Sequence, residues 1–333
     1  ILIQSVVGEN IMPIKKKLLW VDHAYHIKTS STSFISDMLE DTYDVYRYYL
    51  DPYEMLVDGE ICYRDVFKKL EGNKFDTIVF FQLFPPYEEL KYLKFKKIIF
   101  FPMYDGAPSR SEKIWKDYDG NVTIINFSST LHSECIENDF NSKYIQFFQK
   151  PISFSSFGEE HGIFFWQRLT DINIYTICSL IGENNITHVH IHKAIDPSQH
   201  FVECRNLLKN KISYSEWFEY ESDMLNIIEK YALYISPRMY EGIGMSFIKA
   251  MSMGRCVIAV DHPTMNEYIS HGETGLLFDL SHIHDIRIND FDIRKIQKNT
   301  LEYMTEGYEK FQKNLRYIPG WIEESPVARP AKI

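Results

Sequence analysis

The segment from Ser236 to Asp279 constrains the fold of this chain more than any other. Its turn, Glu241-Gly242-Ile243-Gly244, opens an apolar helical run that ends at Gly254. A continuous apolar stretch, Cys256 to Val260, follows at once and has the length of a buried strand. Turn, helix and buried strand in this order are typical of a parallel sheet covered by helices. The segment therefore predicts an α/β fold.

The turn itself has the chemistry of a ligand site. Gly242 and Gly244 lack side chains, so a ligand could approach the backbone there. The helix that begins near Met245 directs free N–H groups and the positive end of its dipole at the turn, which favours a diphosphate. Glu241 is an acceptor and suits sugar hydroxyls. The alternative is an ordinary strand–turn–helix in which Glu241 is a solvated charge.

This pattern, followed by Asn266-Glu267 and by Thr274-Gly275-Leu276-Leu277, resembles glycosyltransferase family four, the glycosyl transferases group 1. These retaining enzymes have the GT-B architecture. The resemblance implies two Rossmann-like domains facing each other across a cleft, with a nucleoside-diphosphate sugar as the donor substrate. It also implies that neither a metal nor another cofactor is required.

The length of 333 residues exceeds one typical core and favours two domains. We predict an N-terminal Rossmann-like, acceptor-side domain over 14–150 and a C-terminal, nucleotide-sugar-binding domain over 151–305. The linker-like run from Gln149 to Gly158 separates them. The resemblance implies that the helix and tail over 306–333 cross back to the first domain.

Apolar runs and amphipathic stretches alternate along both halves of the chain. The predicted strands are Leu18–Val21, Val45–Tyr48, Thr77–Phe81, Ile98–Phe101, Thr123–Phe127, Tyr144–Phe148, Ile163–Trp166, His188–His192, Leu233–Ile235 and Cys256–Val260. The predicted helices are Thr32–Asp41, Asp65–Leu70, Ser129–Asn138, Ile172–Ile181, Ser198–Leu208, Ser222–Tyr231, Asp292–Thr300 and Leu301–Leu315.

Arg168 follows the strand Ile163–Trp166 and occupies the position at which the family has an arginine that binds the donor diphosphate. A guanidinium can grip phosphate through two donors at once. Asn173 stands where the family has an assisting lysine, so one positive charge is missing from this site. Lys193 or Arg238 could supply it.

Two further positions bear on the donor. Lys249 stands where relatives have a second glutamate that binds the ribose, and a lysine cannot accept those hydrogen bonds. It could instead reach a phosphate or a carboxylated sugar. Glu267 matches an acidic position of the family, and its alternative role is to cap a helix.

The first half of the chain contains the candidate acceptor contacts. Its first strand is followed by a loop without glycine, in which His23 and His26 lie where the cleft is expected. Tyr104 and Asp105 follow the strand Ile98–Phe101, near the place of a histidine that contacts the donor sugar in many relatives. We assign His23, His26 and Tyr104 to the acceptor, and Asp105, with Glu241, to the reacting groups.

His188, His190 and His192 alternate along one predicted strand and therefore share a face. The first and third are separated by roughly 13 Å, which is too far for three imidazoles to share one ion at about 2 Å. We therefore expect no metal.

The net charge of −10 argues against nucleic-acid binding. Two basic patches, Lys15-Lys16-Lys17 and Lys94-Phe95-Lys96-Lys97, are either solvated strand entrances or contacts with an anionic membrane surface or acceptor. The five cysteines are scattered, which suggests a reducing, cytoplasmic compartment. We recognise no signal peptide and no membrane span.

The expected function is transfer of a sugar from a nucleoside-diphosphate sugar to a glycan or lipid-linked acceptor, with retention, in polysaccharide or glycoconjugate synthesis. Glu241 would hold the donor sugar, while Arg168 and the N–H groups near Gly244 would stabilise the leaving diphosphate. One alternative is a non-catalytic module that binds a nucleotide, glycan or partner protein. Another is a sugar-nucleotide epimerase of the same architecture.

Overall fold

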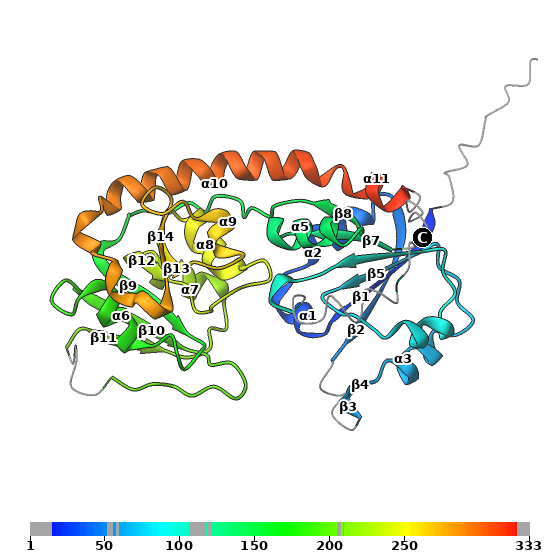
Figure 1. Cartoon of the computed structure of the whole chain (residues 1–333), viewed down its shortest axis with the longest axis horizontal. Helices are drawn as coiled ribbons and strands as arrows, with labels where there is room; N and C mark the ends of the chain where they lie inside the picture. The colour runs from blue at the N-terminus through cyan, green and yellow to red at the C-terminus, as the bar shows by residue number, and fades with distance from the viewer. Residues whose placement is uncertain are drawn as a thin grey trace, which may run out of the picture. The chain divides into compact units, whose positions relative to one another are not determined.

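The computed structural model describes residues 15–51, 56–57, 60–106, 118, 122–204, 208 and 210–324 and contains two six-stranded sheets (Figure 1). Its described residues divide into two compact units. The first lies within Ile1–Phe101, Glu112–Ile124 and Pro319–Ile333, and the second within Pro102–Ser111 and Ile125–Ile318. The predicted α/β class with two Rossmann-like sheets is confirmed. The domain limits at 150/151 and 305/306 stay a prediction.

The first sheet has the order β2-β1-β5-β6-β7-β8. Its strands are β1 (Lys16–His23), β2 (Tyr43–Leu50), β5 (Thr77–Phe81), β6 (Lys97–Phe101), β7 (Val122–Asn126) and β8 (Asn141–Tyr144). The neighbouring pairs from β2 to β7 are parallel, and the middle of each of β1, β5 and β6 is buried. The continuous apolar runs predicted this double-sided burial.

Short elements connect these strands. They are α1 (Tyr25–Thr29), α2 (Ser33–Leu39), the hairpin β3 (Leu56–Val57) with β4 (Glu60–Ile61), α3 (Arg64–Lys69), the 3-10 helices η1 (Tyr87–Tyr92) and η2 (Tyr104–Gly106), and α5 (Ser129–Glu137). The predicted helices α2, α3 and α5 are confirmed. Ser128 caps α5, because its side chain accepts a hydrogen bond from the Leu131 N–H.

The second sheet has the order β11-β10-β9-β12-β13-β14, and all its neighbouring pairs are parallel. Its strands are β9 (Glu159–Gln167), β10 (His188–Lys193), β11 (Ile212–Ser215), β12 (Tyr231–Ile235), β13 (Cys256–Val260) and β14 (Leu276–Phe278). The direction of the strand order reverses between β9 and β12. This is the topological switch point at which doubly wound sheets bind ligands.

The helices that follow these strands are α6 (Ile174–Ile181), α7 (Glu221–Ile228), α8 (Met245–Ser252) and α9 (Met265–Tyr268). The 3-10 helices η4 (Leu280–Asp285) and η5 (Ile288–Asp290) lead to α10 (Ile293–Leu315) and α11 (Ile318–Glu323). None of the helices in the described part of the chain is both long and apolar enough to cross a membrane.

Four predicted elements differ from the structure. The segments 292–300 and 301–315 form one helix, α10, the long orange-to-red helix of Figure 1, because no breaker separates them. The strand predicted over 144–148 ends at Tyr144 as β8, and the buried residues after it leave the sheet.

The predicted helix 198–208 is absent over 198–204, while 205–207 lie outside the described residues. Ser198 has a left-handed φ of 66°, which interrupts a helix, and the His200 N–H donates to Thr170 Oγ1.

The predicted basic patches make contacts within the first unit. Lys16 pairs with Glu323 of α11, and Lys97 donates to the carbonyls of Ile322 and Glu324. Lys96 pairs with Asp76, 2.6 Å away. These ammonium groups have acceptors inside the chain, so the membrane contact stays a prediction.

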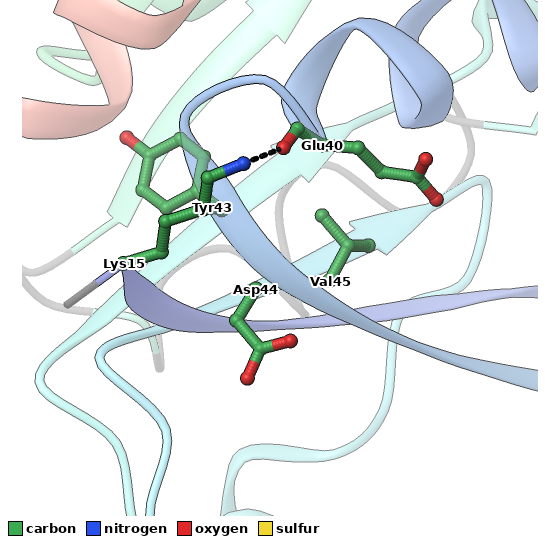
Figure 2. Close-up of a pocket in the computed structure, with 5 residues that line it drawn as sticks. All are labelled: Lys15, Glu40, Tyr43, Asp44 and Val45. Carbon is green, nitrogen blue, oxygen red and sulfur yellow. Dashed lines mark hydrogen bonds between the residues drawn. The ribbon is translucent and has the colours of Figure 1, made fainter. Parts of the chain in front are cut away.

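An open pocket of about 450 Å³ lies at the amino ends of β1 and β2 (Figure 2). Lys15, Glu40, Tyr43, Asp44 and Val45 line it, and the Lys15 ammonium donates to the Glu40 carbonyl. Ligands of parallel α/β sheets bind at the opposite, carboxyl ends of the strands. We therefore place the candidate site elsewhere.

One buried arginine, Arg255, connects the second sheet to the segment that precedes its first strand, β9. Arg255 is fully buried, its ring neighbour is Phe154, and burial lowers the pKa of its guanidinium to about 10. It donates to the backbone carbonyls of Met253, Glu229, Tyr231 and Ser156 at 2.8–3.2 Å. A single side chain thus satisfies four carbonyls from three segments of the chain.

We predict that Arg255→Met lowers the free energy of unfolding by at least about 3 kcal/mol, because these carbonyls, which include those of the buried residues Met253 and Tyr231, lose their donors. Urea unfolding measures it. Arg316→Met, at an exposed position, is the control and should change stability by less than about 0.5 kcal/mol. Equal effects of the two substitutions would refute this role.

The three alternating histidines form a ladder with two serines of β11. Ser213 Oγ lies 2.8 Å from His188 Nε2 and 2.9 Å from His190 Nδ1. Ser215 Oγ lies 2.9 Å from His190 Nε2 and from His192 Nδ1. Burial lowers the pKa of both His190 and His192 to about 4, so these two rings are neutral at physiological pH. Among the described residues, no group of His, Cys, Asp or Glu is placed to hold a metal.

This ladder predicts a pH dependence of stability. The pKa of each buried histidine falls on folding from 6.5 to about 4, so its stabilising contribution is complete above pH 6.5 and is lost as the pH falls toward 4. His190→Gln should reduce this loss by up to about 1.4 kcal/mol per pH unit in that window. Urea unfolding at pH 7.0, 5.5 and 4.5 tests it, and parallel curves for wild type and variant would contradict it.

Candidate active site

The carboxyl ends of β9 and β12, at the switch point of the second sheet, are followed by charged residues. Arg168 comes directly after β9, and Arg238 and Glu241 lie in the loop between β12 and α8. Asp196 follows the next strand, β10, and belongs to the same unit. Because parallel strands end at one edge of the sheet, the topology itself gathers these charges.

Two arginines share one carboxylate at the centre of this cluster. Asp196 Oδ1 accepts from Arg168 Nε at 2.7 Å, and Asp196 Oδ2 accepts from an Arg238 terminal nitrogen at 2.8 Å. The other terminal nitrogen of Arg238 lies 3.3 Å from Asp105 Oδ2. Arg168 also lies 5.1 Å from the centre of the Trp166 ring, within cation–π range.

Glu241 lies buried beside these pairs, with 7% of its surface exposed. Burial raises the pKa of its carboxyl to about 7; Arg238 and Arg168 oppose this rise, and Asp105 and Asp196 add to it. Burial likewise raises the pKa of Asp105, against the pull of the arginines. Three carboxyl groups surround two guanidinium groups, so the surplus acid, Glu241, retains its proton near neutral pH.

Several buried polar atoms at this edge have no hydrogen-bond partner within the described part of the chain. They are Gln167 Oε1, Ser236 Oγ, Arg238 Nε, Glu241 Oε1 and Asp105 Oδ1. Gln167 ends β9 and Ser236 follows β12, so these atoms gather where the strand order reverses. Buried polar groups are normally bonded, so this cluster of atoms has unused capacity to bind ordered water or a polar ligand.

The two glycines of the turn fit tightly against their neighbours. Gly244 caps α8 with a left-handed φ of 82°, and a Cβ there would lie 1.9 Å from the Phe247 ring. A Cβ on Gly242 would lie 2.8 Å from Met103 and 2.9 Å from Asp105 Oδ1. Packing therefore requires both glycines, and the approach of a ligand to them stays a prediction. Met245 begins α8, whose first N–H groups face this turn.

Other predicted donor residues have partners within the chain. Asn173 caps α6, since its Oδ1 accepts from the Tyr175 N–H at 2.8 Å. Lys249 pairs with Glu221 of α7. The Lys193 ammonium lies 4.1 Å from the centre of the Tyr214 ring. The partners of these three side chains are not members of the arginine–carboxylate cluster, and their role in donor binding stays a prediction.

Glu267 caps helix α5. It accepts from Ser128 Oγ at 2.7 Å, from the Ser129 N–H at 2.8 Å and from the Thr130 N–H at 3.0 Å. The capping role foreseen from the sequence is therefore present, although the cap is that of another helix. A carboxylate with three donors is well satisfied and leaves little capacity for a ligand.

The candidate acceptor residues lie in two places. Tyr104 and Asp105 both belong to η2, and burial raises the pKa of the Tyr104 hydroxyl. His23 and His26 belong to the first unit, at the carboxyl end of β1. Their assignment to the acceptor stays a prediction.

Sequence reasoning brought Arg168, Asp105 and Glu241 to the site but missed Asp196. Arg238 appeared only as a substitute for a missing lysine. The signal for Asp196 was its place three residues after the end of β10, at the same sheet edge as Arg168. Because a helix was expected to begin at Ser198, Asp196 was not considered as a residue of the site.

Comparison with known families decides what kind of domain this is. Residues 180–286 match the family model described as Glycosyl transferases group 1. This segment is a glycosyl transferases group 1 domain. It includes Asp196, Arg238 and Glu241, whereas Arg168 and Asp105 precede it. No curated protein sequence matches the chain.

Solved structures show that the chain has the GT-B fold. Sucrose-phosphate synthase from Thermosynechococcus elongatus is 12% identical, with a TM-score of 0.64 over 92% of this chain and 100% of that one. HepE from Anabaena, in complex with UDP, is 12% identical, with a TM-score of 0.60 over 91% and 100%. TarM is 15% identical, with a TM-score of 0.54 over 78% of this chain, which spans only 57% of TarM.

The state of Glu241 in this glycosyl transferases group 1 domain predicts a pH effect. Its pKa rises on folding from 4.5 to about 7, so the folded protein holds the proton more tightly than the unfolded chain, and stability falls as the pH rises from 4.5 to 7. Glu241→Gln removes this fall. We expect its melting temperature to exceed that of the wild type by several degrees at pH 8 and to match it at pH 4.5. A lower melting temperature of the variant at pH 8 would show that the fold stabilises the ionised carboxylate and that the pKa of Glu241 is not raised on folding.

Proposed function

We propose that the chain transfers a sugar from a UDP-sugar to a glycan or lipid-linked acceptor, with retention of the anomeric configuration. The observation that carries the proposal is the group of unpartnered buried polar atoms around Glu241, at the switch point of a group 1 domain. HepE has been solved with UDP-glucose, and the pneumococcal GtfA with UDP and GlcNAc. These neighbours support UDP as the nucleotide.

Each residue of the cluster has a role in this proposal. Protonated Glu241 both donates and accepts hydrogen bonds, so it can hold a sugar hydroxyl in a dry site. Arg168 and Arg238 stabilise the negative charge that grows on the diphosphate as it leaves, with help from the N–H groups at the start of α8. Asp105 contacts the reacting sugar. Because no enzymic nucleophile is assigned, retention requires that the acceptor attacks the sugar on the same face from which the diphosphate leaves.

The second candidate is a non-catalytic module that binds a nucleotide, glycan or partner protein. One observation favours it: Asp196 already pairs with both arginines, Asp105 pairs with Arg238, and Glu221 pairs with Lys249. A diphosphate must therefore compete with internal carboxylates. Turnover of a nucleotide sugar separates the two candidates.

The setting of the reaction belongs to the same proposal. Cytoplasmic polysaccharide or glycoconjugate synthesis agrees with five free cysteines and with a nucleotide-sugar donor. Peripheral contact with a membrane would serve a lipid-linked acceptor. Neither nucleic acid nor a metal has a role in it.

We predict that UDP raises the melting temperature more than GDP, ADP, CMP or dTDP do, and that Arg168→Gln and Arg238→Gln each weaken UDP binding at least tenfold, or about 1.4 kcal/mol. Thermal-shift titration measures both. Arg316→Gln, at an exposed position, is the matched control and should leave UDP binding unchanged.

We also predict that Glu241→Ala abolishes turnover of UDP-glucose and UDP-GlcNAc while the protein stays folded, because the sugar loses its buried partner. Turnover is measured as the amount of UDP released, which chromatography quantifies. UDP binding without turnover in the wild type would favour the non-catalytic module. No response to any nucleotide would refute the donor site.

A further inference from the structure

The carboxyl end of β1 holds a fully buried carboxylate in the first unit. Asp22 is 0% exposed, and both its oxygens accept hydrogen bonds. Oδ2 accepts from Trp20 Nε1 at 3.1 Å and from Thr32 Oγ1 at 2.7 Å. Oδ1 accepts from the His23 N–H at 2.7 Å and lies 2.6 Å from His26 Nδ1. Such a network holds Asp22, and with it the His26 ring, in one position.

The partner of His26 decides which nitrogen carries the proton. A carboxylate only accepts hydrogen bonds, so His26 Nδ1 must donate to Asp22. In its neutral form the ring then has a bare lone pair on Nε2. This nitrogen has no hydrogen-bond partner among the described residues, and 13% of the side chain is exposed. The Phe81 ring packs against the His26 ring in a T-shaped arrangement, with the ring centroids 5.8 Å apart.

His23 has the opposite arrangement. Its Nδ1 accepts from the Tyr25 backbone N–H at 3.0 Å, so the proton of the neutral ring must be on Nε2. Burial, and next the nearby His26, lower the pKa of His23, which keeps it neutral. The two ring centroids are 6.0 Å apart. The end of β1 and the first turn of α1 thus carry an N–H donor and a nitrogen acceptor on neighbouring rings.

We propose that His23 and His26 form a binding site for one hydroxyl group of the acceptor: His23 Nε2–H donates to its oxygen, and its O–H donates to His26 Nε2. A hydroxyl donates and accepts at once, whereas a carboxylate or phosphate dianion only accepts and would face the lone pair of His26. The site therefore selects a neutral polyol or sugar. Asp22 acts as a positioning residue that fixes the tautomer of His26. The identity of this hydroxyl as the acceptor's rests on the proposed function.

Long-range ¹H–¹⁵N spectra of protein labelled at histidine test the two tautomers directly, at pH 8 and without any assay of activity. We expect the proton on Nδ1 of His26 and on Nε2 of His23. Addition of methyl α-D-glucoside, the probe, should shift both Nε2 resonances with one saturation curve. The reverse tautomer of either ring, or no shift at either nitrogen, would overturn the proposal.

Variants then separate binding from structure. His26→Phe keeps an aromatic ring against Phe81. The glucoside should bind this variant at least tenfold more weakly, as measured by the shift of the His23 Nε2 resonance. Asp22→Asn, where it folds, should move the proton of His26 to Nε2 and weaken glucoside binding as much as His26→Phe does. His282→Phe is the matched control, because His282 pairs with Asp279 at an exposed position. Unchanged glucoside binding in His26→Phe would refute the site.

Failure of the proposed function gives a different result. If UDP and UDP-sugars neither bind nor react while the glucoside still shifts both histidines, the donor assignment fails and the hydroxyl site stands. If UDP-glucose is consumed and the glucoside shifts neither histidine, the hydroxyl site alone fails.

Discussion

The charge balance around Asp196 is the constraint on which the candidate site depends. One carboxylate holds two arginines, and a second, Asp105, pairs with Arg238 on its other side. These two carboxylates neutralise the two guanidinium groups, so a third acid in the same dry edge must keep its proton or charge the cluster negatively. The unusual state of Glu241 therefore follows from its neighbours as well as from its burial.

The parallel topology explains why such residues meet. In both sheets, side chains just after a strand lie at the carboxyl edge: Asp22, His23 and His26 around the end of β1, and Arg168 and Asp196 after β9 and β10. The buried middles of β5, β6, β12 and β13 are apolar, and the histidine–serine ladder of β10 and β11 departs from this pattern. The positions that follow the strands are thus the places where polar chemistry can be kept without disturbing a core.

Much of this arrangement could be predicted from the sequence, because apolar runs set the strands and the Glu241 turn set the start of α8. Arg168 and Asp105 came with them, since each follows a strong strand. The partners could not be predicted: that Asp196 bridges two arginines, or that Lys249 meets Glu221, depends on contacts between distant segments. Asn173 shows a different kind of error. By its position it was compared with a lysine of the family, whereas its contacts are those of a helix cap, which its own side-chain chemistry favours.

Competition for the arginines links the two candidate functions. Each arginine–carboxylate pair here is about three-quarters or more buried, so its partner cannot simply be replaced by water. A diphosphate brings several acceptor oxygens and negative charge to the same donors, and binding it favours protonation of the neighbouring acids. Glu241 already holds a proton near neutral pH, so the cluster can accept an anion without first accumulating a third negative charge. Burial of Glu241 disfavours its charged form, and because this acid can stay neutral, the arginines remain available to an anionic ligand.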